Sequence, residues 1–102
     1  MSTAITRTEI LDRLREHEDE LHRRGVKRVA LFGSAARGDA RADSDIDLMV
    51  DIDPNARIDL FAYVGIVQYL EDLFPVRVDV ANHAKLKPLA RPKIERDAIY
   101  AF

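Results

Sequence analysis

The sequence contains no cysteine among its 102 residues. Disulfide frameworks, zinc–thiolate sites and thiol nucleophiles are therefore excluded. It also carries little net charge, −2 at pH 7, with a pI of about 5.9. Because binding to a nucleic-acid backbone depends on clustered Lys and Arg, this balance argues against direct nucleic-acid binding as the main activity.

Long apolar runs are missing as well. No stretch approaches the roughly 20 residues that span a membrane, and residues 1–7 lack the apolar core of a signal peptide. These absences predict a cytoplasmic protein without a membrane partner. Nucleoside triphosphates would be available to it there. At 47% hydrophobic and 33% charged residues the chain has a globular composition, and its length suits a single domain, 1–102.

The first third of the chain is predicted to form a helix and then a buried strand. Thr6 and Glu9 have the spacing of a capping box, which begins the helix, and Gly25 marks its end. Residues 26–32 follow. Their continuous apolar run, 29–32, is typical of a strand buried on both faces.

Alternation of apolar and polar residues predicts two more strands, 46–52 and 77–81. Residues 57–74 have the length and pattern of a helix between them, so these two strands should be parallel. The first two strands have a short connection and should be antiparallel.

Two C-terminal helices, 86–90 and 93–102, complete the expected order of elements. The predicted fold class is therefore α/β (α+β), with a small mixed sheet of three to four strands flanked by helices.

The helix expected over 57–74 has an unusually thin polar face. A helix that is apolar nearly all round in so small a chain predicts an interface with another protein or a second copy. Its aromatic residues Phe61, Tyr63 and Tyr69 are interpreted as core or interface rather than base-stacking groups. The basic C-terminal residues predict a solvated face, with docking of an acidic partner as the alternative: Lys85, Lys87, Arg91, Lys93 and Arg96.

A small-residue turn follows the first strand. Gly33 allows the backbone to turn sharply, and Ser34 supplies a hydroxyl and an N–H group where a triphosphate could bind. Arg37 lies three residues further and could reach a phosphate oxygen. The alternative is an ion pair of Arg37 with Asp39 or Asp43.

Three aspartates are the predicted metal ligands. Asp45 and Asp47 are two residues apart, so on a strand both carboxylates project from one face, and Asp79 could join them from another strand. Crowded carboxylates repel one another, and a divalent cation relieves the repulsion. Oxygen ligands favour Mg²⁺ or Mn²⁺, and two ions about 3.5–4 Å apart would hold the attacking and leaving oxygens. For Asp79, pairing with Arg77 or Arg91 is the alternative.

Other acidic residues and the histidines receive simpler interpretations. Taken singly, Asp45 suits an Asx-turn and Asp47 a solvated strand position, but the pair favours function. Asp51 lies about 13 Å beyond Asp47 at roughly 3.3 Å per residue, so Asp51 and Asp53 are expected to face solvent. No catalytic or metal role is assigned to the histidines: His17, His22 and His83.

The pattern Gly33-Ser34, ten residues, then Asp45-x-Asp47 resembles the signature of the DNA polymerase β-type nucleotidyltransferase superfamily. The fuller string LFGSAARGDARADSDIDLMV is similar to its minimal members, the minimal nucleotidyltransferase (MNT) proteins. The resemblance runs over about residues 26–81.

This resemblance implies a role for each matched residue. Asp45 and Asp47 would bind the metal ions. Asp79 would be the third carboxylate, which also draws the proton from the acceptor hydroxyl. Gly33 and Ser34 would hold the phosphates of the nucleoside triphosphate.

Stand-alone MNT proteins resemble the MntA-like antitoxins of HEPN/MNT pairs. In that family AMP is transferred from ATP to a tyrosine of a HEPN ribonuclease toxin. The resemblance therefore implies a Mg²⁺-dependent protein adenylyltransferase with ATP as substrate and a HEPN toxin as partner. Larger superfamily members add a helical domain for the acceptor, so here the acceptor is expected to dock from outside, on residues 57–74.

Two other functions stay open at this point. One is nucleotidyl transfer to a small molecule such as an aminoglycoside, with a partner subunit completing the pocket. The other is a non-catalytic antitoxin that acts by binding alone. The intact Asp45, Asp47 and Asp79 count against the second, because crowded acids without a use would cost stability.

Overall fold

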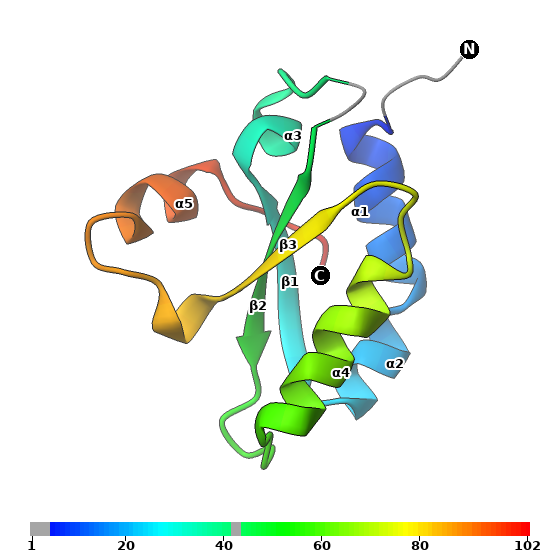
Figure 1. Ribbon diagram of the computed structural model, residues 1–102, viewed down its shortest axis with the longest axis vertical. Coiled ribbons are helices and arrows are strands. Elements are labelled where there is room, and N and C mark those ends of the chain that lie inside the picture. The colour runs from blue at the N-terminus through cyan, green and yellow to red at the C-terminus, as the bar shows by residue number, and fades with distance from the viewer. Residues whose placement is uncertain (1–4, 42–43) are drawn as a thin grey trace.

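The computed structural model describes residues 5–41 and 44–102, which form a four-stranded sheet with the order β3-β2-β1-β4. Strand β1 pairs antiparallel with β2 and β4, whereas β2 and β3 are parallel (Figure 1). The expected mixed sheet and both expected strand directions are confirmed. The strands are β1 (Val26–Phe32), β2 (Ile46–Ile52), β3 (Val78–Asn82) and β4 (Ile99–Tyr100).

The helices divide between the two faces of this sheet. Helices α1, α2 and α4 cover one face, and α5 lies on the other side (Figure 1). No helix in the described ranges has both the length and the apolar character to cross a membrane. The helices are α1 (Arg7–Glu16), α2 (Glu18–Arg23), α3 (Gly33–Arg37), α4 (Leu60–Glu71) and α5 (Arg91–Asp97), with a 3₁₀ turn, η1 (His83–Lys85).

The main core lies between the sheet and the three helices that cover it. Alternate residues of the central strands, Leu31 and Leu48 among them, are fully buried against α1, α2 and α4. The opposite face is closed as well at the middle of the sheet, since Ala30 and Met49 are also buried. Burial on both faces accounts for the continuous apolar run in β1.

The N-terminal helix begins as predicted but is interrupted. Thr6 caps it, because the Glu9 N–H donates to the Thr6 hydroxyl at 3.1 Å and the Glu9 carboxylate accepts in return from the Thr6 N–H at 3.4 Å. At His17 the single expected helix divides into α1 and α2. The His17 ring is half-buried, with Nδ1 2.6 Å from the hydroxyl of Tyr69 on α4.

The C-terminal segment differs most from expectation. The helix expected over 86–90 is absent from the described structure, and the helix expected over 93–102 ends at Asp97. Ala98 is extended, and Ile99 and Tyr100 then pair with β1 as strand β4. The β-branched and aromatic residues there bond to the free edge of β1, which outweighs their local helical pattern.

Candidate active site

Gly33 directly follows β1 and lies beside the start of β2. Its φ of +76° is in the left-handed region, and a Cβ at this position would collide with the carboxylate of Asp47. Both facts require glycine here. Phe32, the residue before it, is the register partner of Asp47 across the antiparallel pair. The turn that begins with Gly33 and Ser34 therefore lies directly against the Asp47 side chain.

Asp79 approaches from the other side of Asp47. The two residues are register partners in the parallel pair β2–β3, so their side chains leave the same face of the sheet. Asp45 lies just before β2, two residues from Asp47. The structure thus brings the three predicted aspartates to one end of the sheet, with Asp47 and Asp79 on the same face.

The charges around Asp47 affect its ionisation. Partial burial is the largest cause that raises the pKa of Asp47, and the negative charges of Asp79 and then Asp45 raise it further. The positive charge of Arg37 opposes this shift. The three carboxylates and the guanidinium therefore share one electrostatic environment.

In this structure the three carboxylates are not arranged closely enough to surround a metal ion. Among residues 5–41 and 44–102, no three acidic or histidine side chains converge closely enough to hold a metal ion. Asp79 instead lies 3.7 Å from the Arg77 guanidinium in an exposed pair, and Arg91 contacts Glu95. Mutual repulsion separates like charges, and a cation bound between them would remove that repulsion. The all-oxygen donor set fits Mg²⁺ or Mn²⁺.

Arg37 is already held by other acidic groups. Its Nη1 donates to Asp97 Oδ2 on α5 at 3.1 Å, and its Nε lies 3.5 Å from Asp39 Oδ2. The alternative with Asp39 is thus present in the structure, while Asp43 falls outside the described residues. No local pattern in the sequence points to Asp97, which lies 60 residues from Arg37.

The expectation that Asp51 faces solvent is wrong. Its carboxylate lies 2.5 Å from His83 Nδ1 and accepts from the Tyr100 hydroxyl at 3.4 Å. The other ring nitrogen of His83 lies 2.6 Å from Glu95. The bond to Glu95 is the main cause that raises the pKa of His83, and Asp51 adds to it. These contacts tie β2, η1 and α5 together, a role that local spacing does not reveal.

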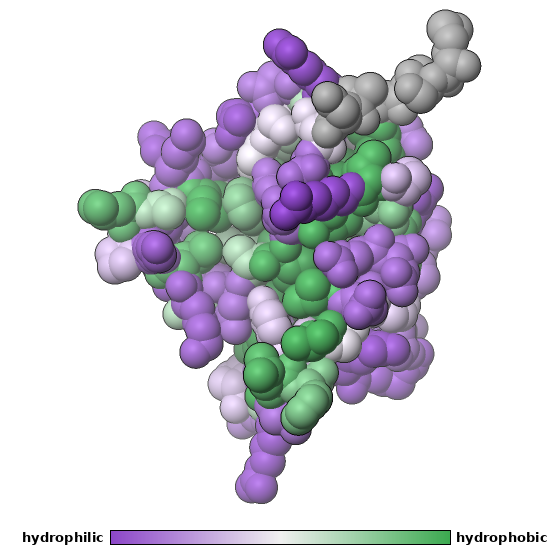
Figure 2. All heavy atoms as spheres, viewed as in Figure 1, coloured by the Kyte–Doolittle hydropathy of each residue, from purple (hydrophilic) through white to green (hydrophobic). Residues whose placement is uncertain are grey.

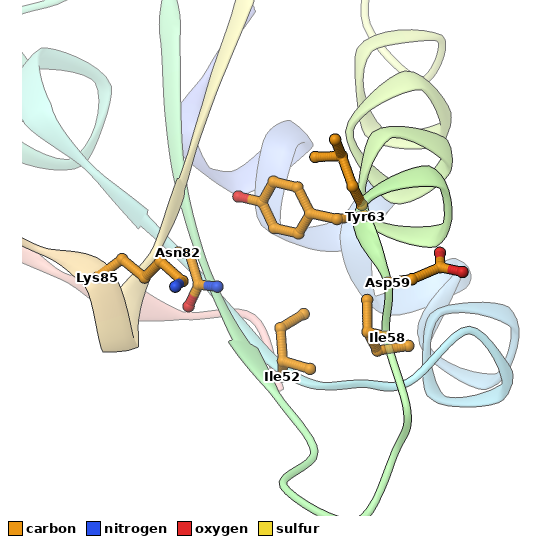
Figure 3. A pocket seen from close by; sticks show the side chains of 7 residues that line it. Ile52, Ile58, Asp59, Tyr63, Asn82 and Lys85 are labelled. Carbon is orange, nitrogen blue, oxygen red and sulfur yellow. The ribbon is translucent and has the colours of Figure 1, made fainter.

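A cavity of about 570 Å³ lies at the opposite end of the sheet from the aspartates. Figure 3 shows Tyr63 pointing from α4 toward Asn82 and Lys85, with Ile52 and Ile58 below. Its lining is mostly apolar, with Lys85 as the one cation among the described residues that line it, so it does not have the cluster of charged groups expected of a triphosphate site. The remaining lining residues are Asp59 and Leu60.

Apolar side chains also gather beside this cavity, over the start of α4 (Figure 2). Leu60, Phe61 and Val64 are exposed by 73%, 86% and 52%. We call these three residues the α4 patch. Asp59 caps the helix by accepting from the Ala62 N–H at 2.8 Å, so the helix begins at Leu60 rather than at residue 57.

The glycine–serine turn beside Asp47 on a mixed sheet agrees with the sequence pattern that resembles a nucleotidyltransferase. The chain belongs to the nucleotidyltransferase domain family, which matches residues 11–101. A proposed protein adenylyltransferase from Methanocaldococcus jannaschii is 38% identical over 97 residues, covering 93% of this chain and 97% of that protein. The protein adenylyltransferase MntA of Thermococcus cleftensis is 35% identical over 97 residues, covering 94% of this chain and 96% of its own.

Solved structures agree on the fold. A proposed minimal nucleotidyltransferase, 35% identical, superposes with a TM-score of 0.76 over 93% of this chain and 95% of its own. A MNT antitoxin in complex with a tri-AMPylated HEPN toxin from Shewanella oneidensis has a TM-score of 0.64 at 15% identity, covering 95% and 72% of the two chains. The second likeness concerns the fold alone. Family membership makes this protein a nucleotidyltransferase enzyme.

Proposed function

We propose that this nucleotidyltransferase transfers AMP from ATP, with Mg²⁺, to a tyrosine hydroxyl of a HEPN-family ribonuclease toxin and thereby neutralises it. The observation that carries the proposal is the position of Asp47, with the Gly33 turn on one side and Asp79 on the other. The names of the full-length relatives support a protein acceptor and an adenylyl donor. The resemblance to MNT antitoxins supports the toxin partner.

In the proposed reaction the acceptor oxygen attacks the α-phosphorus of ATP. The P–O bond to the β-phosphate breaks, pyrophosphate leaves, and an ester joins AMP to the acceptor. Asp79 accepts the proton of the attacking hydroxyl. The Ser34 turn binds the leaving phosphates, and Asp45 and Asp47 would hold Mg²⁺, which neutralises charge on the triphosphate.

The α4 patch supports a protein acceptor over a small molecule. Exposed Leu60, Phe61 and Val64 adjoin the apolar cavity and would be buried by a partner. Ile52, at the cavity, lies five residues beyond Asp47, or about 16 Å along the strand. An acceptor that contacts both the patch and the aspartates must span about this distance, which favours a protein over a small molecule.

The test is to incubate the protein with each nucleoside triphosphate, Mg²⁺ and the product of the neighbouring gene, which the proposal expects to be a HEPN protein, and to weigh both proteins by intact mass spectrometry. We expect the HEPN protein to gain one or more AMP units with ATP. The double variant D45N/D47N should add none while still forming the complex. A stable complex without any mass gain would instead support neutralisation by binding, and modification of added aminoglycosides alone would support a small-molecule acceptor.

A further inference from the structure

Helices α3 and α5 meet through a single ion pair at their C-terminal ends. Arg37, the last residue of α3, donates to Asp97, the last residue of α5, at 3.1 Å. The Asp97 side chain is 20% exposed and that of Arg37 is 43% exposed. The pair is therefore partly covered yet open to an incoming solute.

Arg37 also lies close to the proposed phosphate site. Helix α3 begins with Gly33, whose backbone touches Asp47, and Arg37 is one turn further on. The guanidinium acts electrostatically on Asp47 from there, since its charge opposes the rise in the pKa of that carboxyl. Arg37 thus lies between the aspartates of the site and Asp97 on α5.

We propose that Asp97 is a positioning residue that holds Arg37 as an internal counter-ion until the triphosphate of an incoming nucleotide displaces it. This inference rests on the nucleotide-binding part of the proposed function. A triphosphate carries several negative charges and accepts from two guanidinium N–H groups at once, whereas Asp97 carries one charge and accepts only from Nη1 of Arg37 at a partly exposed site. The exchange is therefore favourable, but Asp97 weakens nucleotide binding by competing for Arg37.

The exchange also couples nucleotide binding to α5. When Arg37 turns to the triphosphate, α5 loses its bond to α3 and stays attached through Glu95, which lies 2.6 Å from His83. By linkage, whatever loosens α5 from Arg37 strengthens nucleotide binding to the same extent. Backbone amides of α5 should then exchange faster with solvent when the site is filled.

The test is the affinity for α,β-methylene ATP with Mg²⁺, measured by calorimetry, since this analogue resists transfer. We expect D97N to bind about two- to fivefold more tightly than the wild type, in line with the small strength of a partly exposed ion pair. R37Q should bind more weakly, and adding D97N to R37Q should change nothing. E95Q, on the same helix, is the matched control and should not tighten binding.

Unchanged or weaker binding by folded D97N would overturn the inference, provided that the wild type binds the nucleotide. If the wild type binds no nucleotide at all, the proposed function itself fails. Should D97N not fold, D97S provides the same comparison. Hydrogen exchange of the wild type is an independent readout, and exchange in α5 that does not rise on nucleotide binding also overturns the inference.

Discussion

At the scale of single residues, Gly33 offers a direct test of the site geometry. Its φ of +76° and the collision of a Cβ with Asp47 both oppose any side chain. Gly38, at the other end of α3, has a similar φ of +84° but no atom within 4 Å of a Cβ. The two glycines therefore separate backbone strain from crowding at the carboxylate.

We predict that G33A lowers the free energy of unfolding by about 3 kcal/mol and abolishes nucleotide binding, whereas G38A costs about 1 kcal/mol. The difference arises because an alanine in place of Gly38 would bear only left-handed strain, while an alanine in place of Gly33 would also displace Asp47. Urea denaturation and nucleotide affinity check this. Equal losses in the two variants would show that the turn does not pack against Asp47 as described.

The sequence predicted Gly33, Asp45 and Asp47 from a local pattern, whereas it predicted Asp79 from strand alternation and from the family resemblance. Gly33, Asp45 and Asp47 form a fixed local pattern, and their spacing suffices to place them. Placing Asp79 beside Asp47 requires the register of β2 on β3, and finding Asp97 beside Arg37 requires a contact across 60 residues. Neither of these two contacts can be read from a local pattern in the sequence.

At the scale of elements, His83 joins β2 to α5. The ring lies between Asp51 and Glu95, and these contacts raise its pKa, while Tyr100 of β4 and Arg91 of α5 donate to Asp51 and to the His83 carbonyl. A raised pKa means that the folded state favours the protonated ring. This contribution to stability is complete below the unfolded value near 6.5 and is lost as pH rises through the folded value.

We therefore predict that H83Q destabilises the protein by about 1 kcal/mol at pH 6 and by less at pH 9, since partly exposed charged hydrogen bonds are of this strength. Denaturant titration at both pH values measures the change. H22Q is the comparison variant, because the exposed His22 ring has one carboxylate neighbour among the described residues, Glu18 at 3.7 Å, away from the sheet–α5 contact, and its loss should have the smaller effect. A loss by H83Q that is constant with pH would contradict the role of the charged ring.

The elements that the sequence predicted correctly are those with a strong local period. Both β1 and β2 have the predicted bounds, because the apolar run and the alternation end at Gly33 and at the Asp53-Pro54 turn. The prediction of a helix over residues 99–102 is wrong because they form a short apolar segment that suits a helix or a strand equally well. Their state depends on the unpaired edge of β1, which no local pattern encodes.

At the scale of the whole molecule, the proposed catalytic site and the α4 patch are separated. The aspartates lie at the start of β2 and β3, and the patch lies near the far ends of these strands. Chemistry and acceptor binding should therefore respond to different substitutions. In a small-molecule transferase, by contrast, the acceptor would contact only the neighbourhood of the aspartates.

We predict that F61S, alone or with L60S, weakens binding to the acceptor protein at least tenfold and slows AMP transfer accordingly, because a large apolar anchor at an interface is lost. Stability and nucleotide affinity should be unchanged, since Leu60 and Phe61 are 73% and 86% exposed and Leu60 lines the cavity at the end of β2 opposite Asp47. L89S is the matched control, because Leu89 is 98% exposed but lies before α5, outside the patch. Calorimetric titration with the acceptor, together with intact mass after transfer, measures both effects. Equal loss of binding in F61S and L89S would mean that the acceptor does not bind specifically at the α4 patch. Full AMP transfer by F61S would show that the acceptor docks on another surface of the molecule.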